Sequence, residues 1–279
     1  MKKKLLITLG CSYTEGVGCY DETLFTTSTI ESRQKELSIS EKYEMHRNSF
    51  HANGWPVQLA SKMGYDRLIN MGLAGSGTSG QLKRFYESQY YRESFDEYDT
   101  TIMWLLSEPS RFGMYSEGVV RDILPKYTHN DDWFGATLQK GYVEFVKYMD
   151  NDPILDQIFY IKTLEHYCEN MGFNLLLSHS NFELDGLLKY NYKSKYYITP
   201  YPTSIMETGY INPICLHPTK EGYGIFVDNI YKSITKYHSY VLPEYPLDEN
   251  KLEWEWFGAG LCHIPPREDV KEKIRNQQI

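Results

Sequence analysis

The stretch Leu5-Leu6-Ile7-Thr8-Leu9-Gly10-Cys11-Ser12-Tyr13-Thr14-Glu15-Gly16 decides how this chain folds. Its apolar opening, 5–9, predicts a buried β-strand. Gly10 and Gly16 then permit a sharp turn, which places Ser12 just beyond the carboxyl end of that strand. A serine held on such a turn is a candidate nucleophile if a base lies beside it, and otherwise it is only part of a turn.

The candidate base lies far along the chain. His217 belongs to the run Leu216-His217-Pro218-Thr219-Lys220-Glu221-Gly222, which precedes a strongly periodic helix with Thr219 as its expected N-cap. A histidine that opens the last helix of an α/β domain can meet Ser12 over one edge of the sheet. Imidazole can take the hydroxyl proton near neutral pH. The alternative is that His217 merely starts the helix.

Strand-like and helical patterns alternate along the chain, which predicts βαβ units and a parallel sheet. The expected strands are Lys4–Leu9, Arg67–Asn70, 100–106, Asn174–His179 and a weak one near 196–198. The expected helices are Trp55–Met63, one after Gly80, one over 153–172 and one from 219 onward.

Two segments interrupt this alternation. Residues 20–53 are polar and read as an insertion over the carboxyl edge of the sheet, in which His46 and His51 are expected to be solvated. Residues 240–279 carry Trp254, Trp256 and Phe257 without periodicity. We therefore expect one α/β domain over 1–239, which includes the insertion, and a C-terminal extension or interaction arm over 240–279. That arm should pack on the domain or on another subunit.

The bulk composition excludes several classes of protein. At 279 residues and 41% hydrophobic content, the chain can bury a large core, and its net charge of −8 argues against a nucleic-acid partner. No run approaches the ~20 apolar residues of a membrane span. The run after Lys2-Lys3-Lys4 is too short for a signal peptide. The cysteines are scattered without metal spacing, which favours free thiols and a cytoplasmic location.

Four blocks carry a resemblance to a known family. They are 10–16, Asn70-Met71-Gly72-Leu73-Ala74-Gly75-Ser76-Gly77, Trp104-Leu105-Leu106-Ser107-Glu108-Pro109-Ser110-Arg111, and 217–222. In this order the chain resembles the SGNH (GDSL-like) hydrolases over about residues 4–238. The first and last blocks together are specific, the second is moderately so, and the third is a poor match.

The resemblance implies an α/β three-layer sandwich with a central parallel five-stranded sheet, of the flavodoxin-like, SGNH hydrolase type. It implies that Ser12 is the nucleophile and that His217 is the general base and later the acid. The Gly75 and Ser12 backbone N–H groups would form the oxyanion hole. No cofactor and no metal are implied.

The chain departs from the family pattern in two places. Ser107 stands near the position of a usual Asn, so its shorter hydroxyl would be the further oxyanion donor. Ile214 stands where the family tends to have an Asp that orients the histidine, so Asn212 or a backbone carbonyl would take that role.

Other residues near the blocks have weaker assignments. Tyr13 and Arg111 are candidate substrate-binding residues, and Arg111 could equally form a surface salt bridge. Cys11 reads as a small buried side chain behind the turn. Tyrosines over 190–201 could provide stacking walls for a sugar.

These observations favour a serine esterase of SGNH type that removes a small acyl group from a carbohydrate or similar ester through a Ser12–His217 dyad. The alternative is a virion-associated or other structural protein that keeps the fold as a binding module with weak or no hydrolysis. The long insertion and the altered third block resemble SGNH-like proteins of tailed bacteriophages. In that case the protein would be located in the virion, and the C-terminal arm would contact a virion partner or a second copy of the chain.

Overall fold

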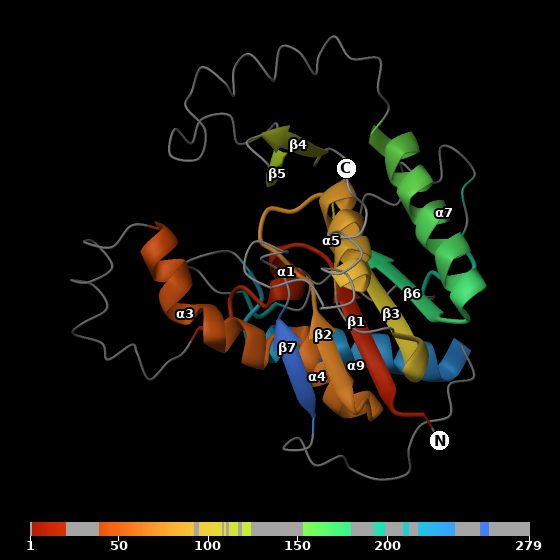
Figure 1. The fold of residues 1–279 in the computed structure, drawn as a ribbon. Coiled ribbons are helices and arrows are strands. Elements are labelled where there is room, and N and C mark those ends of the chain that lie inside the picture. Colours follow the sequence, from red (N-terminus) through yellow and green to blue (C-terminus); the bar gives the residue numbers. More distant parts are fainter. Residues whose placement is uncertain are drawn as a thin grey trace, which may run out of the picture.

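The structure, a computed structural model, describes residues 2–20, 39–91, 95–107, 109, 112–116, 119–123, 153–179, 192, 194–198, 209–211, 217–237 and 252–256. Within them lies a sheet of five parallel strands (Figure 1). The strands are β1 (Lys4–Leu9), β2 (Arg67–Asn70), β3 (Asp99–Leu106), β6 (Asn174–His179) and β7 (Glu253–Trp256). The predicted α/β class with a central parallel sheet is confirmed, and β1, β2, β3 and β6 match their predicted ranges closely.

The order of the strands defines where a ligand would bind. Across the sheet the strands run β6-β3-β1-β2-β7, with Leu9 opposite Trp104 on one side and Thr8 opposite Asn70 on the other. The chain passes from β1 to β2 and then crosses to β3 on the far side of β1, so the strand order reverses at β1. Open α/β sheets bind ligands beyond the carboxyl ends of the strands at such a reversal, which is where Ser12 lies.

Helices cover both faces of the sheet (Figure 1). The alternation of side chains along β1 sends Leu5 and Ile7 into one apolar cluster and Leu6 into the other. The first cluster contains side chains of α5 (Thr78–Tyr91) and α7 (Pro153–Met171). The second contains those of α4 (Trp55–Met63) and α9 (Lys220–Tyr237). Covering on both faces explains the continuous apolar runs of these strands.

The ends of the helices follow from local chemistry. Pro56 lies in the first turn of α4, and Gly64 ends that helix in the left-handed region at φ +74°. The predicted N-cap of α9 is confirmed, because the Gly222 N–H donates to Thr219 Oγ1 at 3.3 Å. Helix α5 begins at Thr78, slightly earlier than predicted.

The predicted fifth strand is corrected by the structure. Near 196–198 there is only an isolated parallel bridge between Leu177 and Tyr197, while the fifth strand is β7, on the opposite edge beside β2. Residues 253–256 of the expected interaction arm therefore pack on their own domain rather than on a neighbouring subunit or partner, because the strand completes the edge of the sheet beside β2. Trp254 in this strand is 40% exposed. Phe257 lies outside the described residues.

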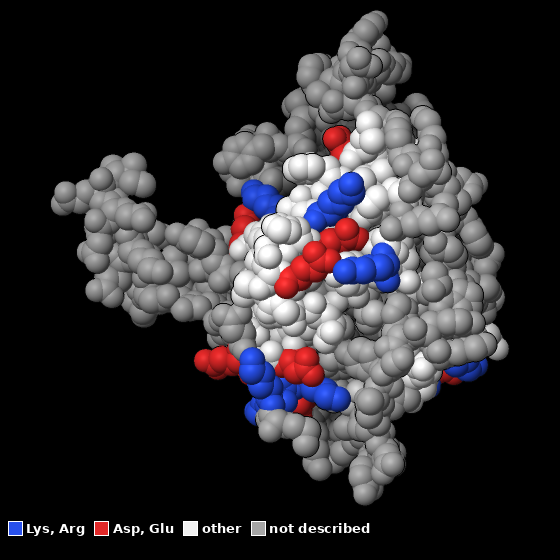
Figure 2. Space-filling model, turned by 90° about the vertical axis from the view of Figure 1, so that its right-hand side faces the viewer, with Lys and Arg blue, Asp and Glu red and all other residues white. Residues whose placement is uncertain are grey.

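Two further elements were not predicted. Part of the polar insertion forms the helix α3 (Ile39–Asn53), and β4 (Phe112–Ser116) pairs with β5 (Val119–Ile123) as an antiparallel ribbon. The described cysteines, Cys11, Cys19 and Cys168, are buried free thiols. Within the described part of the chain, no helix combines the length and apolar character needed to cross a membrane. The face shown in Figure 2 mixes basic and acidic side chains rather than gathering one sign.

Acidification should destabilise this fold through His179, at the carboxyl end of β6. Burial lowers the pKa of His179 to about 4, and its Nε2 lies 3.1 Å from the Tyr197 hydroxyl. The unfolded chain takes up a proton below pH ~6.5, whereas the folded chain resists until about pH 4. Stability is therefore lost as pH falls through this window.

The matched variant is His179→Gln, which keeps a polar side chain but does not titrate. Between pH 6.5 and 4.5, wild type should lose about 1–2 kcal/mol more of its free energy of unfolding than the variant. Urea unfolding at several pH values measures this difference. Parallel pH dependences of the two proteins would contradict the assignment.

Candidate active site

Ser12 begins a one-turn helix directly after β1. This helix, α1 (Ser12–Glu15), starts with the Thr14 and Glu15 N–H groups donating to the Cys11 carbonyl at 3.0 Å each. Gly16 ends it at φ +94°, a left-handed conformation that favours glycine. Cys11 is fully buried, as predicted. The turn thus fixes Ser12 at the carboxyl end of the central strand, with its side chain largely shielded from solvent.

The predicted meeting of Ser12 and His217 is confirmed as a contact. His217 Nε2 lies 2.8 Å from Ser12 Oγ, although the two residues come from opposite ends of the domain. The Tyr223 hydroxyl of α9 donates to the Val17 carbonyl at 2.7 Å and so ties the start of α9 to the turn after α1. The 2.8 Å distance between Ser12 Oγ and His217 Nε2 is that of a nucleophile and its base.

Gly18 allows the close approach of His217 to this turn. It has φ +110°, and a Cβ added there would lie 2.2 Å from the Pro218 carbonyl oxygen and 3.0 Å from His217 Cβ. Only a residue without a side chain fits this position. The backbone of His217 is therefore seated directly against the turn that carries Ser12.

Tyr13 lies against the imidazole of His217. The two ring centroids are 4.9 Å apart and the rings are tilted by 41°. Tyr13 was predicted as a substrate-binding residue, and that role stays a prediction. What the structure adds is a contact with the candidate base, in which an aromatic ring can support a protonated imidazole.

The second block forms a loop in which one backbone donor stands out. Over 71–76, the N–H groups of every residue except Gly75 donate to another described residue. Gly75 has φ +80°, and a Cβ added there would meet nothing within 4 Å. A backbone N–H without a partner among the described residues, in a loop whose other N–H groups are bonded, is available to a ligand. It belongs to the residue predicted as an oxyanion donor.

This loop is bonded to the turn that carries Ser12. The Leu73 N–H and the Ser76 hydroxyl both donate to the Gly10 carbonyl, at 3.3 and 3.0 Å. Asn70, at the end of β2, donates to the Thr14 carbonyl at 2.9 Å and accepts from the Gly72 N–H at 2.9 Å. A Cβ at Gly72 would lie 2.3 Å from the Glu15 backbone nitrogen. The two candidate oxyanion donors are therefore carried by two loops in direct contact.

The Ser107 hydroxyl is occupied beneath this loop. It donates to the Ser76 carbonyl at 3.0 Å and accepts from Gln81 Nε2 at 2.6 Å, and Gln81 in turn accepts from the Trp104 indole at 2.7 Å. A hydroxyl has one proton to donate. The predicted role of Ser107 as an oxyanion donor would require the bond to Ser76 to break, whereas the observed bonds support the loop from below.

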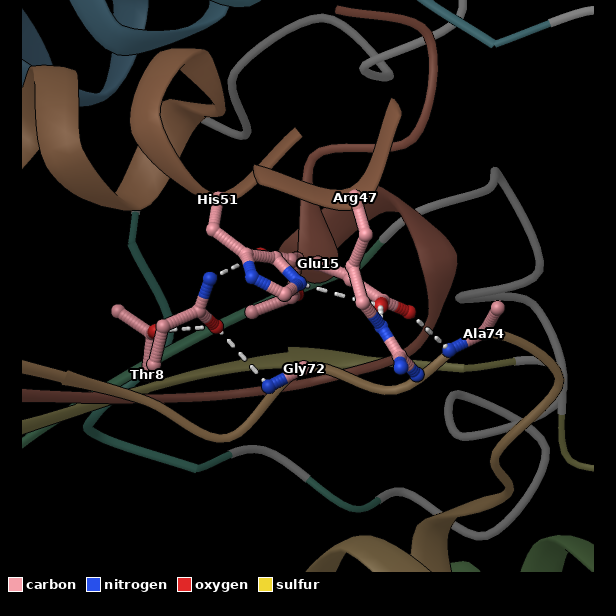
Figure 3. Close-up of polar contacts among 8 residues, drawn as sticks. Thr8, Glu15, Arg47, His51, Gly72 and Ala74 are labelled. Carbon is pink, nitrogen blue, oxygen red and sulfur yellow. Dashed lines mark hydrogen bonds and ion pairs between the residues drawn. The ribbon is translucent and has the colours of Figure 1, made fainter. Parts of the chain in front are cut away.

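His46 and His51 are not solvated, and this prediction was wrong. They are 1% and 5% exposed, because α3 contacts α4, His46 packs against Tyr20, and His51 reaches Glu15 of α1. His51 Nε2 lies 3.3 Å from Oε1 of Glu15, a fully buried carboxylate (Figure 3). The low hydropathy of the insertion concealed this burial, since Arg47 and His51 of α3 lie beside a buried acid of another element.

Several residues with structural roles had no predicted function. Glu15, Asn70 and Gln81 hold the loops of the site, and each is a polar side chain at or shortly after the carboxyl end of β1 or β2. That position was the available signal, because parallel strands bring their carboxyl ends together. Arg111, Asn212 and Ile214 lie outside the described residues. No cluster of metal-ligating side chains occurs among the residues that are described.

Substitution of Gly18 should separate His217 from Ser12. In Gly18→Ala the added Cβ must push back the Pro218 carbonyl, whereas Gly209→Ala has nothing within 4 Å. Both positions have a positive φ, +110° at Gly18 and +77° at Gly209, so the difference in stability combines the greater backbone strain at Gly18 with the close approach. We expect Gly18→Ala to be less stable than Gly209→Ala by about 1–3 kcal/mol in chemical denaturation. Equal losses would show that the approach is loose.

Comparisons with family models, with curated proteins and with solved structures find no match to this chain. The chemistry of the site is therefore inferred from its residues and from the geometry of Ser12, His217 and the loop at 71–76.

Proposed function

We propose that this protein is a serine ester hydrolase of the SGNH type, in which Ser12 is the nucleophile and His217 the base. The observation that carries the proposal is the 2.8 Å contact between Ser12 Oγ and His217 Nε2 at the strand-order reversal. A neutral serine is a weak nucleophile, and a base within hydrogen-bond distance activates it. A serine that only forms part of a turn does not require an imidazole at hydrogen-bond distance from its hydroxyl.

In the acylation step, Ser12 Oγ attacks the carbonyl carbon of the ester while His217 Nε2 takes the hydroxyl proton. The tetrahedral intermediate carries its negative charge on the former carbonyl oxygen. His217 then gives its proton to the alcohol oxygen, the bond between that oxygen and the acyl carbon breaks, and the alcohol leaves. Tyr13 supports the transient imidazolium through its ring contact with His217.

The negative charge of the intermediate needs donors already in place. Neither the Ser12 nor the Gly75 backbone N–H donates to another described residue, so both are available for this purpose. Preorganised donors of this kind usually give the largest single contribution to catalysis. In deacylation, His217 Nε2 takes a proton from a water molecule while the water oxygen attacks the acyl carbon. The bond between that carbon and Ser12 Oγ then breaks, His217 returns the proton to Oγ, and the carboxylic acid leaves.

For the substrate, we propose an ester with a small acyl group such as acetyl. Ser12 is only 8% exposed, and this limited access favours a small group over a long lipid chain. A carbohydrate as the alcohol remains a prediction. The described tyrosines of the Tyr-rich stretch face elsewhere: Tyr192 and Tyr196 donate to Glu165 and Glu169 of α7, and Tyr197 contacts His179.

Labelling with a fluorophosphonate tests the nucleophile without knowledge of the substrate. Wild type should form one adduct, located at Ser12 by mass spectrometry, and Ser12→Ala should form none. His217→Gln should slow labelling by about 100-fold or more, because it removes the general base. Ser88→Ala is the control, since this buried serine bonds to the Phe85 carbonyl away from the site. An unlabelled wild type would contradict the proposal and favour a protein that only binds.

The oxyanion donor is tested by Gly75→Val. A β-branched residue is unfavourable at φ +80°, so the loop must rotate and carry its N–H away. Hydrolysis of p-nitrophenyl acetate should fall by about 100-fold or more. Gly172→Val is matched to it, with φ +70° and free space at the end of α7, and should match it in stability while retaining hydrolysis. Equal activity of the two variants would argue against Gly75 as a donor.

A further inference from the structure

Glu15 is the most unusual residue near the site. Its side chain has no solvent exposure, although an ionised carboxylate is costly to bury unless partners satisfy it. It lies only a few residues after Ser12, on the same short helix. Because burying a carboxylate costs free energy of folding, its presence here points to a role that an apolar residue could not perform.

The first role of this carboxylate is to hold the loop of the second block. Its Oε2 accepts the backbone N–H of Ala74 at 2.7 Å, a short charge-assisted hydrogen bond (Figure 3). Ala74 directly precedes Gly75, whose N–H donates to no other described residue. The orientation of one peptide group limits that of the next, so the bond to Ala74 helps to aim the Gly75 N–H.

The other oxygen of Glu15 is held by α3. Oε1 lies 3.3 Å from His51 Nε2 and 3.7 Å from Arg47 Nε, and both side chains descend from α3 onto the carboxylate in Figure 3. Their i, i+4 spacing places them on one face of the helix. One oxygen of the Glu15 carboxylate thus contacts side chains of the insertion, and the other oxygen holds the loop at Ala74.

We infer that Glu15 is a positioning residue for the oxyanion hole, and that α3 supplies the residues which hold it in place. This inference rests on the proposed function, because it presumes that the Gly75 N–H stabilises an oxyanion. It assigns the polar insertion to the catalytic apparatus. It also requires that the length of the Glu15 side chain matters more than its charge, since the reach to Ala74 is what sets the loop.

Two variants separate reach from charge. Glu15→Asp keeps the carboxylate beside Arg47 and His51 but is one methylene shorter, so it cannot span both sides of its site. Glu15→Gln keeps the length and an oxygen that can accept from Ala74, but loses the charge. Thr100→Val is the control for lost stability, because it removes a buried hydrogen bond to the Phe95 carbonyl at the opposite end of β3.

Kinetics with p-nitrophenyl acetate provide the readout. For Glu15→Asp we expect kcat to fall by about 10- to 100-fold with KM nearly unchanged, because an oxyanion donor acts in the transition state. For Glu15→Gln we expect a loss of about threefold, since a neutral acceptor bonds the amide more weakly. Thr100→Val should keep the kcat of wild type. Hydrogen exchange of the peptide over 71–77 should be faster in Glu15→Asp than in Glu15→Gln.

The outcomes distinguish this inference from the proposed function. If wild type is labelled at Ser12 but Glu15→Asp retains kcat, or Glu15→Gln loses as much as Glu15→Asp, the inference is overturned and the proposed function stands. If wild type is not labelled, the proposed function falls and the inference falls with it. If wild type is labelled at Ser12, and only Glu15→Asp shows faster hydrogen exchange over 71–77 and a strongly lowered kcat, the results support both the inference and the proposed function.

Discussion

The structure depends on the position of β1 between β2 and β3. Because all three strands run parallel, their carboxyl ends meet at one edge, and the turn after β1, the loop after β2 and Ser107 after β3 are brought together there. The reversal of strand order at β1 keeps the connecting segments on opposite sides, so a ligand can reach this edge. The contacts among these three segments follow from that placement.

Hydrogen bonding at this edge divides the polar groups into two kinds. Most are satisfied by one another: Gly10 by Leu73 and Ser76, and Asn70 by Thr14 and Gly72. These bonds fix two loops against each other. The backbone donors of Ser12 and Gly75 are left without a partner among the described residues. A site prepared for a developing charge requires this combination of rigid loops and uncommitted donors.

The polar insertion contributes to this edge of the sheet through α3. Helix α3 brings basic side chains onto Glu15, and the side chains of Tyr20 and Phe50 pack edge to face beside them, with ring centroids 5.2 Å apart. A buried acid satisfied from two elements makes the geometry of both depend on it. The insertion, whose polar sequence predicted exposure to solvent, therefore contacts the short helix that begins at Ser12.

The sequence by itself determined β1, β2, β3, β6 and the main helices, and the order of its four blocks predicted the contact of Ser12 with His217. Apolar runs, helical periodicity, and capping and turn residues act over a few neighbouring residues, so they can be read locally. Only the tertiary structure decided that β7 joins the sheet, that His51 is buried, and that the Ser107 hydroxyl bonds to Ser76. Each depends on a partner many residues away. The free energy of a buried polar group is set by that partner, which no local pattern specifies.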